Sequence, residues 1–347
     1  MNSACPACFS KRMGRSECPD CGAKYPVSGW DKADVVTIAM AGAVNSGKSH
    51  YIASMVAELA IYVSQAFGNA ITPLGNTADN LAENYLIRIT GVDPRTGKPV
   101  LDPATGFPAQ PGKLDTTASL ATENAYQKEP LMWSLGRIGG VTRVLVIRDV
   151  AGEDIEQGRL VLPEFAFFPR SDAVFFMFDP HSIPGIDTLL PPEALDKAGA
   201  RSDAVWANLA AALPAGGPMM GVIVSKFDLL QSLKNQHDPK WSYVMSNASA
   251  RFYQDQPPSA RPRLENGQLM RGDPDDALKL SLELISLLDL AGGQEDKFLR
   301  ASASANPRFF AVSSLGEPVK GQRLSPRGIC RFRVLDPITW VFNRRWF

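Results

Sequence analysis

The sequence predicts an α/β fold, with a doubly wound and mostly parallel sheet behind a short cysteine-rich segment. Short runs of apolar, β-branched or aromatic residues alternate with stretches of helical periodicity along most of the 347 residues. That alternation is typical of a parallel sheet covered by helices on both faces. A glycine-rich loop directly after the first of these strands, and four cysteines ahead of it, complete the pattern.

Composition restricts the class of protein further. Hydrophobic residues make up 45% of the chain, enough for a sizeable core, and Lys+Arg and Asp+Glu both number 36. This balance gives no reason to expect nucleic acid or an acidic membrane as a partner. The opening MNSACPACFSKR lacks the apolar centre of a signal peptide, and no uncharged apolar run approaches the roughly 20 residues that span a bilayer. We therefore expect a cytoplasmic protein without a membrane span.

The N-terminal segment, residues 1–28, carries two CxxC turns. They are formed by Cys5 with Cys8 and by Cys18 with Cys21. Each turn can direct two thiolates at one tetrahedral zinc ion, and a redox dithiol is the alternative. Clustering without a leader sequence favours metal over disulfides, and so small a segment needs a metal to fold. The sequence therefore predicts a zinc ribbon that docks on a protein partner or on the rest of the chain.

The first predicted strand, Val35–Ala41, runs into a glycine loop and then into a helix that continues to about Phe67. Residues 42–49 match GxxxxGKS in full. In such a loop backbone N–H groups turn inward toward phosphate oxygens, and the helix N-terminus adds partial positive charge. Lys48 is expected to reach the outer phosphates. The residues expected to bind the phosphates or their Mg²⁺ are Gly42, Asn45, Ser46, Gly47, Lys48, Ser49 and His50.

Proline, glycine and aspartate dominate the segment from about Gly91 to Gly112. It contains two near-copies of one turn, DPRTGKP and DPATGFP. This composition predicts an exposed excursion around residues 91–113, such as a hairpin, and a tolerated surface insertion is the simplest interpretation.

Further strands and helices complete the predicted sheet. The expected strands are Leu131–Leu135, Thr142–Ile147, Ala173–Phe178, Met220–Val224 and Arg308–Val312. The expected helices are Val205–Leu213, Asp275–Leu290 and a short aromatic helix at Ile338–Phe347 that docks on the protein's own core. The strand assignments rest on short apolar runs, and the helix assignments on apolar residues at helical spacing.

Asp149 ends the strand TRVLVIRD, and Gly152 follows three residues later. A phosphate-binding loop needs an acidic residue at the end of a neighbouring strand to hold its Mg²⁺. A glycine at position 152 would let a backbone N–H approach a γ-phosphate. The sequence therefore predicts Ser49 and Asp149 as magnesium ligands, with Gly152 beside the phosphate.

A base site is predicted at the ends of the last two strands. Its expected residues are Ser225, Lys226 and Asp228, with Ser313, Ser314 and Leu315. The carboxylate of Asp228 can accept hydrogen bonds from the ring N–H and the exocyclic amino group of guanine, whereas adenine matches it poorly. The stem of Lys226 would lie along the base, and backbone N–H groups after the last strand would bind the guanine carbonyl. The expected ligand is GTP or GDP.

GAVNSGKS, DVAG, SKFD and SSL, in this order and each at a strand end, resemble the motifs of the translation-factor and Ras-like class of P-loop GTPases. The continuation DVAGED and the zinc ribbon are similar to the bacterial double-GTPase families, although this chain shows one P-loop. The resemblance covers about Val35 to Leu315. We expect a GTPase-like domain over residues 33–347, with the insertion around 91–113 and a C-terminal extension after residue 316. The resemblance also implies a switch that hydrolyses GTP slowly and binds a protein partner through its switch loops or zinc ribbon.

Two positions depart from that class. Ser225 replaces the usual asparagine of NKxD, and Glu153 stands where Ras-like members have the glutamine that positions the attacking water. The carboxylate of Glu153 could orient the water, but it would also repel a γ-phosphate. Two alternatives therefore stay open: an interaction protein that binds GTP without turnover, and an ATPase in which SKFD is accidental.

The class also places a threonine from a mobile loop on Mg²⁺ and the γ-phosphate. Thr122, Thr117 and Thr116 are the candidates, and the distance to the next strand favours Thr122. Lys48, Thr122 and Glu153 are accordingly the residues expected to act in catalysis.

Overall fold

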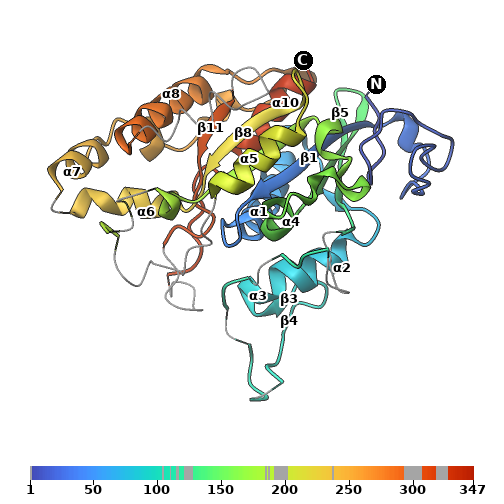
Figure 1. Ribbon diagram of the computed structural model, residues 1–347. Helices are drawn as coiled ribbons and strands as arrows, with labels where there is room; N and C mark the ends of the chain where they lie inside the picture. Colours follow the sequence, from blue (N-terminus) through green and yellow to red (C-terminus); the bar gives the residue numbers. More distant parts are fainter. Residues whose placement is uncertain are drawn as a thin grey trace.

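The computed structural model describes residues 2–103, 105–109, 111–114, 117–120, 128–183, 186, 188–190, 202–236, 238–292, 307–317 and 327–347. Its centre is a seven-stranded sheet (Figure 1). In sheet order, the strands span Arg308–Ala311 (β11), Met219–Val224 (β8), Ala173–Phe178 (β7), Asp34–Gly42 (β1), Val141–Arg148 (β6), Leu131–Ile138 (β5) and Thr72–Pro73 (β2). The five from β11 to β6 run parallel, whereas β5 and β2 are each antiparallel to their neighbour. The predicted α/β fold with a mostly parallel sheet is confirmed.

The predicted strands all occur, because the central part of this sheet is buried on both faces. Every residue of β1 and of β7 is buried. A strand covered on both faces has a continuous apolar sequence instead of an alternating one. That is why β7 begins and ends at the predicted residues, whereas the outer β5 continues beyond Leu135 to Ile138.

Two groups of buried side chains form the core, one on each face of the sheet. Helices α1 (Lys48–Phe67) and α10 (Asp336–Arg345) contribute to one group, and α5 (Ser202–Ala212) and α8 (Asp275–Leu290) contribute to the other. Figure 1 shows α5 crossing in front of the central strands. The predicted docking of the C-terminal helix on the core is confirmed. Among the described helices, none has the length and apolarity needed to cross a membrane.

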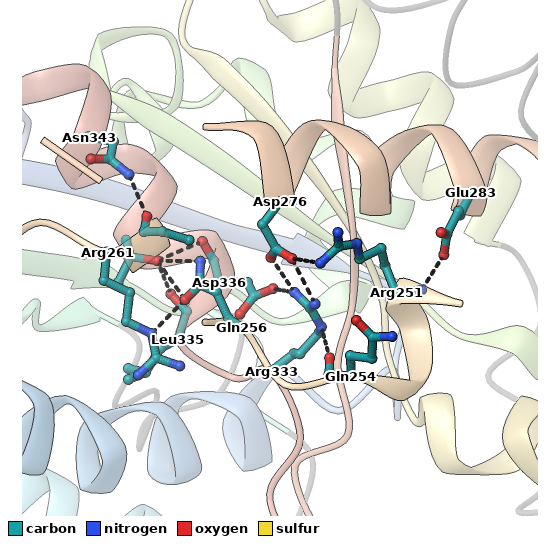
Figure 2. A network of polar contacts seen from close by, with 12 residues as sticks. Arg251, Gln254, Gln256, Arg261, Asp276, Glu283, Arg333, Leu335, Asp336 and Asn343 are labelled. Carbon is teal, nitrogen blue, oxygen red and sulfur yellow. Dashed lines mark hydrogen bonds and ion pairs between the residues drawn. The ribbon is translucent and has the colours of Figure 1, made fainter. Parts of the chain in front are cut away.

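A buried polar network joins α8 to the segment before α10 (Figure 2). Arg333 is fully buried and donates to Asp276 Oδ2 at 2.9 Å, and it also pairs with Asp336 at the start of α10. On the exposed side of the same network, Arg251 contacts Asp276 at 3.3 Å. The network therefore fixes the C-terminal helix against the body of the protein through charges as well as apolar contacts.

Several short elements were not predicted, because segments of three to seven residues carry too little periodicity. They are α2 (Thr77–Leu81), a π-helical turn (Ala82–Leu86), α3 (Ile87–Thr90), α4 (Gly152–Glu156), α6 (Phe227–Ser232), α7 (Pro239–Met245) and the strand pair β9 (Arg263–Glu265) and β10 (Gln268–Met270). The excursion at 91–113 does contain a hairpin, formed by β3 (Val92–Asp93) and β4 (Lys98–Pro99).

The N-terminal segment packs on the same core as the sheet. Phe9 and Trp30 are buried among residues of the central strands. The Trp30 indole donates to the carbonyl of Ala4 at 2.8 Å, and the Val35 N–H donates to the carbonyl of Asn2 at 3.2 Å. The cysteine-rich segment is thus attached to the first residues of β1.

Candidate functional site

The carboxyl ends of the parallel strands meet at one edge of the sheet, and the predicted site residues follow them there. The segments at this edge are the loop 42–49 after β1, Asp149 after β6, Asp179 after β7, Ser225–Asp228 after β8 and Ser313 after β11. In open parallel sheets this edge is where ligands bind. The topology therefore brings the separate motifs together.

The loop after β1 has a backbone conformation that favours glycine at two positions. Gly42 has φ 146 and Gly47 has φ 92, in the region that side chains other than glycine rarely adopt. A Cβ on Gly42 would also lie 2.7 Å from the carbonyl oxygen of Met177 on β7. Asn45 has φ 62 and is one of the residue types that tolerate it. The loop therefore turns sharply before α1 begins at Lys48.

Lys48 lies inside this loop and is buried. Its Nζ donates hydrogen bonds of 3.0 Å to the carbonyl oxygens of Gly42 and Ala43. Burial lowers the pKa of Lys48 to about 8, although the Asp149 carboxylate opposes this shift. Because both hydrogen-bond partners are neutral, the position favours an anionic ligand.

One side-chain oxygen each from Ser49, Thr117 and Asp149 together form a compact triangle. The hydroxyls of Ser49 and Thr117 each lie 3.2 Å from Asp149 Oδ2 and 3.2 Å from one another. Tyr85, from the unpredicted π-helical turn, donates to the same carboxylate oxygen at 3.1 Å. Asp149 Oδ1 is buried without a hydrogen-bond partner in the described part of the chain. Burial raises the pKa of Asp149, which the positive charge of Lys48 partly counters.

The threonine candidates have different outcomes. Thr122 and Thr116 lie outside the described residues. Thr117 is the candidate whose hydroxyl the structure places against Ser49 and Asp149.

His50 anchors the segment that leads to Thr117. Its Nε2 accepts a hydrogen bond from the Leu114 N–H at 3.2 Å. Burial lowers the pKa of His50 to about 3, and the charges of Lys113 and Lys226 add to the shift. The ring is therefore neutral near pH 7 and acts as an acceptor. The expected contact of His50 with phosphate stays a prediction, whereas its ring has a structural partner.

Gly152 lies directly against the loop. A Cβ at this position would lie 2.5 Å from the Val44 nitrogen and 2.8 Å from the Gly42 oxygen. Only glycine fits this approach without movement of the backbone. Glu153 follows in the first turn of α4, and its side chain is exposed.

Asp154 was missed as a site residue. It is fully buried and accepts hydrogen bonds from Ser119 Oγ at 2.6 Å and the Leu120 N–H at 3.0 Å. Arg159 pairs with the same carboxylate at 2.6 Å. This contact joins the segment after Gly152 to the segment around Thr117. Asp154 is visible in the sequence as the last residue of DVAGED, but its contacts with Ser119 and Leu120 join segments that lie far apart in the sequence.

The two halves of the expected base site meet. Asp228 Oδ1 accepts a 2.5 Å hydrogen bond from Ser313 Oγ, which itself accepts one from the Gly316 N–H. Burial raises the pKa of Asp228, and the hydrogen bond from Ser313 opposes the rise. The Ser225 hydroxyl instead donates to the Phe178 carbonyl at 3.1 Å, so its side chain braces β8 against β7.

Lys226 adopts a left-handed conformation, with φ 48, and pairs with Asp179 Oδ2 at 2.7 Å. Burial alone would raise the pKa of Asp179, but Lys226 and His181 lower it to about 2. Beyond Ser313, the carbonyls of Ser314 and Leu315 accept hydrogen bonds from Ser54 Oγ and the Cys330 N–H.

The four N-terminal cysteines form a group that could hold a metal ion. Their sulfurs all lie within 4.8 Å of one another. Cys5 lies 3.6 Å from Cys21, and Cys8 lies 3.7 Å from Cys18. Tetrahedral zinc with Zn–S bonds of about 2.3 Å separates its sulfurs by roughly 3.8 Å. The spacing therefore suits zinc.

Comparison with known proteins gives one informative similarity. No family model matches the chain. The chain is 37% identical over 333 residues, 93% of this chain and 78% of the relative, to a protein of Mycolicibacterium smegmatis described as "Putative ESX-1 scaffolding and assembly protein SaeC". A solved structure from Thermus thermophilus covers 80% of this chain at 13% identity and a TM-score of 0.27, and this chain spans 37% of its length. That TM-score supports no inference.

Proposed function

This chain belongs to the family of the Mycolicibacterium smegmatis protein SaeC, and from that premise we propose that it is a guanine-nucleotide-dependent switch in protein assembly. GTP and Mg²⁺ would bind at the carboxyl edge of the sheet, and zinc would bind the N-terminal cysteines. The part of the proposal that concerns a protein partner rests on the description of the relative as a scaffolding and assembly protein. The nucleotide rests on the geometry of the site.

The observation that carries the proposal is the oxygen triangle of Ser49, Thr117 and Asp149, beside a buried lysine. Its sides measure 3.2 Å. Neighbouring ligands of octahedral Mg²⁺, at bonds of 2.0–2.1 Å, lie about 2.9 Å apart, so small movements would let the three oxygens share one ion. A cation held there would also favour the charged form of the buried Asp149 carboxylate, whose Oδ1 has no hydrogen-bond partner in the described part of the chain.

Lys48 and the loop supply the complementary phosphate site. The ammonium group is buried among carbonyl oxygens, so a phosphate oxygen would be a better partner than the carbonyls it now contacts. Gly152 packs against the loop backbone, so its N–H could donate to a terminal phosphate held in the loop. Loss of that phosphate would release the segments around Thr117 and Gly152.

Guanine is favoured by the pairing of Asp228 with Ser313. The Ser313 hydroxyl donates to Oδ1 of Asp228, and the second carboxylate oxygen would accept a hydrogen bond from the ligand. Guanine offers two donors to such an acceptor. Adenine would place an acceptor there and leave the carboxylate unpaired.

A binding protein without turnover is the second candidate, and the position of Glu153 favours it. Its side chain is exposed at the start of α4, and a carboxylate there would repel the γ-phosphate. Hydrolysis by positioned water would accordingly be slow. Prolonged incubation with GTP and Mg²⁺, assayed for phosphate, separates the two: release that is lost in Lys48→Ala supports the switch, and none supports the binding protein.

Calorimetric titration of the zinc-loaded chain with GTP, GDP and ATP in Mg²⁺ tests the ligand. We expect GTP and GDP to bind at least a hundredfold more tightly than ATP, about 2.7 kcal/mol. Asp228→Asn should reduce that preference, whereas Lys48→Ala should weaken all three nucleotides. Equal affinity for ATP would overturn the guanine assignment, and unchanged affinity in Lys48→Ala would overturn the phosphate site.

A further inference from the structure

Strand β6 carries a buried arginine near each end. One of the two pairs with a carboxylate, and the other does not. Arg143 pairs with Asp34 and stacks over Trp346, 4.5 Å from the ring centroid. Arg148, the last residue of β6, stacks over Phe167 at 4.4 Å. Only 7% of Arg148 is exposed, and no carboxylate among the described residues lies within ion-pair distance of it. A buried charge without a counter-ion is strongly unfavourable.

The surroundings of Arg148 are the cysteine cluster. Its Nη1 donates to the Ala7 carbonyl at 2.8 Å, and Ala7 lies between Cys5 and Cys8. The cysteine sulfurs are the nearby groups that could carry a negative charge and so stabilise its cationic form. Neutral thiols would supply no such charge. A divalent metal bound by four thiolates carries a net double negative charge, and one arginine would neutralise part of it.

We propose that Arg148 is the counter-ion of the metal–thiolate cluster and couples metal occupancy to the position of Asp149. Asp149 is the next residue in the chain, so a change in the backbone at Arg148 would also shift the carboxylate that lies between Ser49 and Thr117. The metal therefore supports the core at the end of β6 and does not merely fold the N-terminal segment.

A second contact runs parallel to this one. Phe9, next to Cys8, is buried and meets Phe167 edge-on, with ring centroids 5.5 Å apart. Phe167 lies below the Arg148 guanidinium and belongs to the chain that follows α4. The cysteine segment thus contacts the residues before and after Gly152. The effect on nucleotide affinity rests on the proposed function, whereas the effect on metal affinity does not.

Zinc affinity of the full-length chain, measured without nucleotide by competition with a chromophoric chelator, tests the proposal. We expect Arg148→Met to weaken zinc binding at least tenfold and Arg148→Lys, which keeps the charge, to weaken it less. Arg143→Met is the matched control, because it removes a buried, ring-stacked arginine from the same strand, and it should change zinc affinity less than twofold. Affinity of Arg148→Met within twofold of the wild type would overturn the proposal.

Hydrogen exchange of the wild-type chain decides the matter if Arg148→Met does not fold. Removal of zinc by a chelator should increase exchange in peptides covering residues 144–150 and 165–168 relative to α8. An increase confined to residues 2–28 would overturn the coupling. Neither measurement involves GTP, so a failure of nucleotide binding would leave both results interpretable.

Discussion

Lys48 is the single residue on which the proposed phosphate site depends most, and its burial predicts a pH effect. The fold holds the pKa of Lys48 at about 8, below 10.5 for an ordinary lysine. A bound phosphate would favour the ammonium form, so affinity for GDP should be level below pH 8 and fall above it, by up to about tenfold per pH unit. Titration calorimetry across this range measures it. Asp228→Asn should keep the same slope, and affinity that does not change with pH would contradict the role of Lys48.

The same shift has the opposite sign for folding. Between pH 8 and 10.5 the unfolded chain binds more protons at Lys48 than the folded chain does. The contribution of Lys48 to the stability of the ligand-free protein therefore increases as pH rises through this window.

Gly152 gives a steric prediction. The Cβ of Gly152→Ala would lie 2.5 Å from the Val44 nitrogen, and backbone must move to relieve that contact. We expect nucleotide affinity to fall by tenfold or more. Gly158→Ala is the control, because its Cβ would meet nothing within 4 Å although its φ is 71. It should cost about 1 kcal/mol of folding free energy and leave GDP affinity unchanged. Equal effects of the two variants on affinity would show that the contact at Val44 is unimportant.

At the scale of elements, the length of an element and the sequence separation of its contacts determine how much can be predicted from the sequence. α8 was predicted at both ends, Asp275 and Leu290, because sixteen residues give several turns of apolar periodicity. The motif order likewise predicts which strand ends carry the site. Tyr85 could not be found this way, because its contact with Asp149 joins positions 64 residues apart. The contacts of Asp154 and Arg148 likewise join residues far apart in the sequence, so they could not be predicted either.

Asp154 couples two elements that nucleotide is proposed to order. It holds Ser119 and Leu120 against α4. In Asp154→Asn the amide keeps an acceptor oxygen but loses the charge that pairs with Arg159. We expect faster hydrogen exchange in residues 117–120 of this variant. We also expect these residues to regain protection more slowly when GTP is added. Glu164→Gln, at an exposed position, is the control, and equal exchange in the two variants would argue against the coupling.

On the scale of the whole molecule, charges placed far apart in the sequence close the fold at both ends. Arg148 faces the N-terminal cysteines, and Arg333 joins α8 to α10 (Figure 2). Both arginines are buried, so each needs its partner to be in place. Both ends of the described chain are therefore parts of the same core as the sheet. A substitution that removes either charge contact should also disturb the residues at the carboxyl ends of the strands.

Arg333→Met tests the C-terminal closure. Its loss would leave Asp276 and Asp336 buried without their shared cation, which costs about 3–5 kcal/mol in comparable buried pairs. Arg251→Met removes the half-buried partner of Asp276 and should cost less than about 1 kcal/mol. Burial already raises the pKa of Asp336 to about 6 against the pull of Arg333. The variant should raise it further.

The destabilisation by Arg333→Met should therefore depend on pH in a defined direction. A raised carboxyl pKa makes the folded chain bind more protons than the unfolded chain, so stability is lost as pH rises. Urea unfolding near pH 5 and near pH 8 should show the larger loss at pH 8, because the ionised Asp336 that Arg333 stabilises in the wild-type chain has no cation in the variant. An equal loss at both values would mean that Arg333 acts through packing and that its charge is unimportant for the closure.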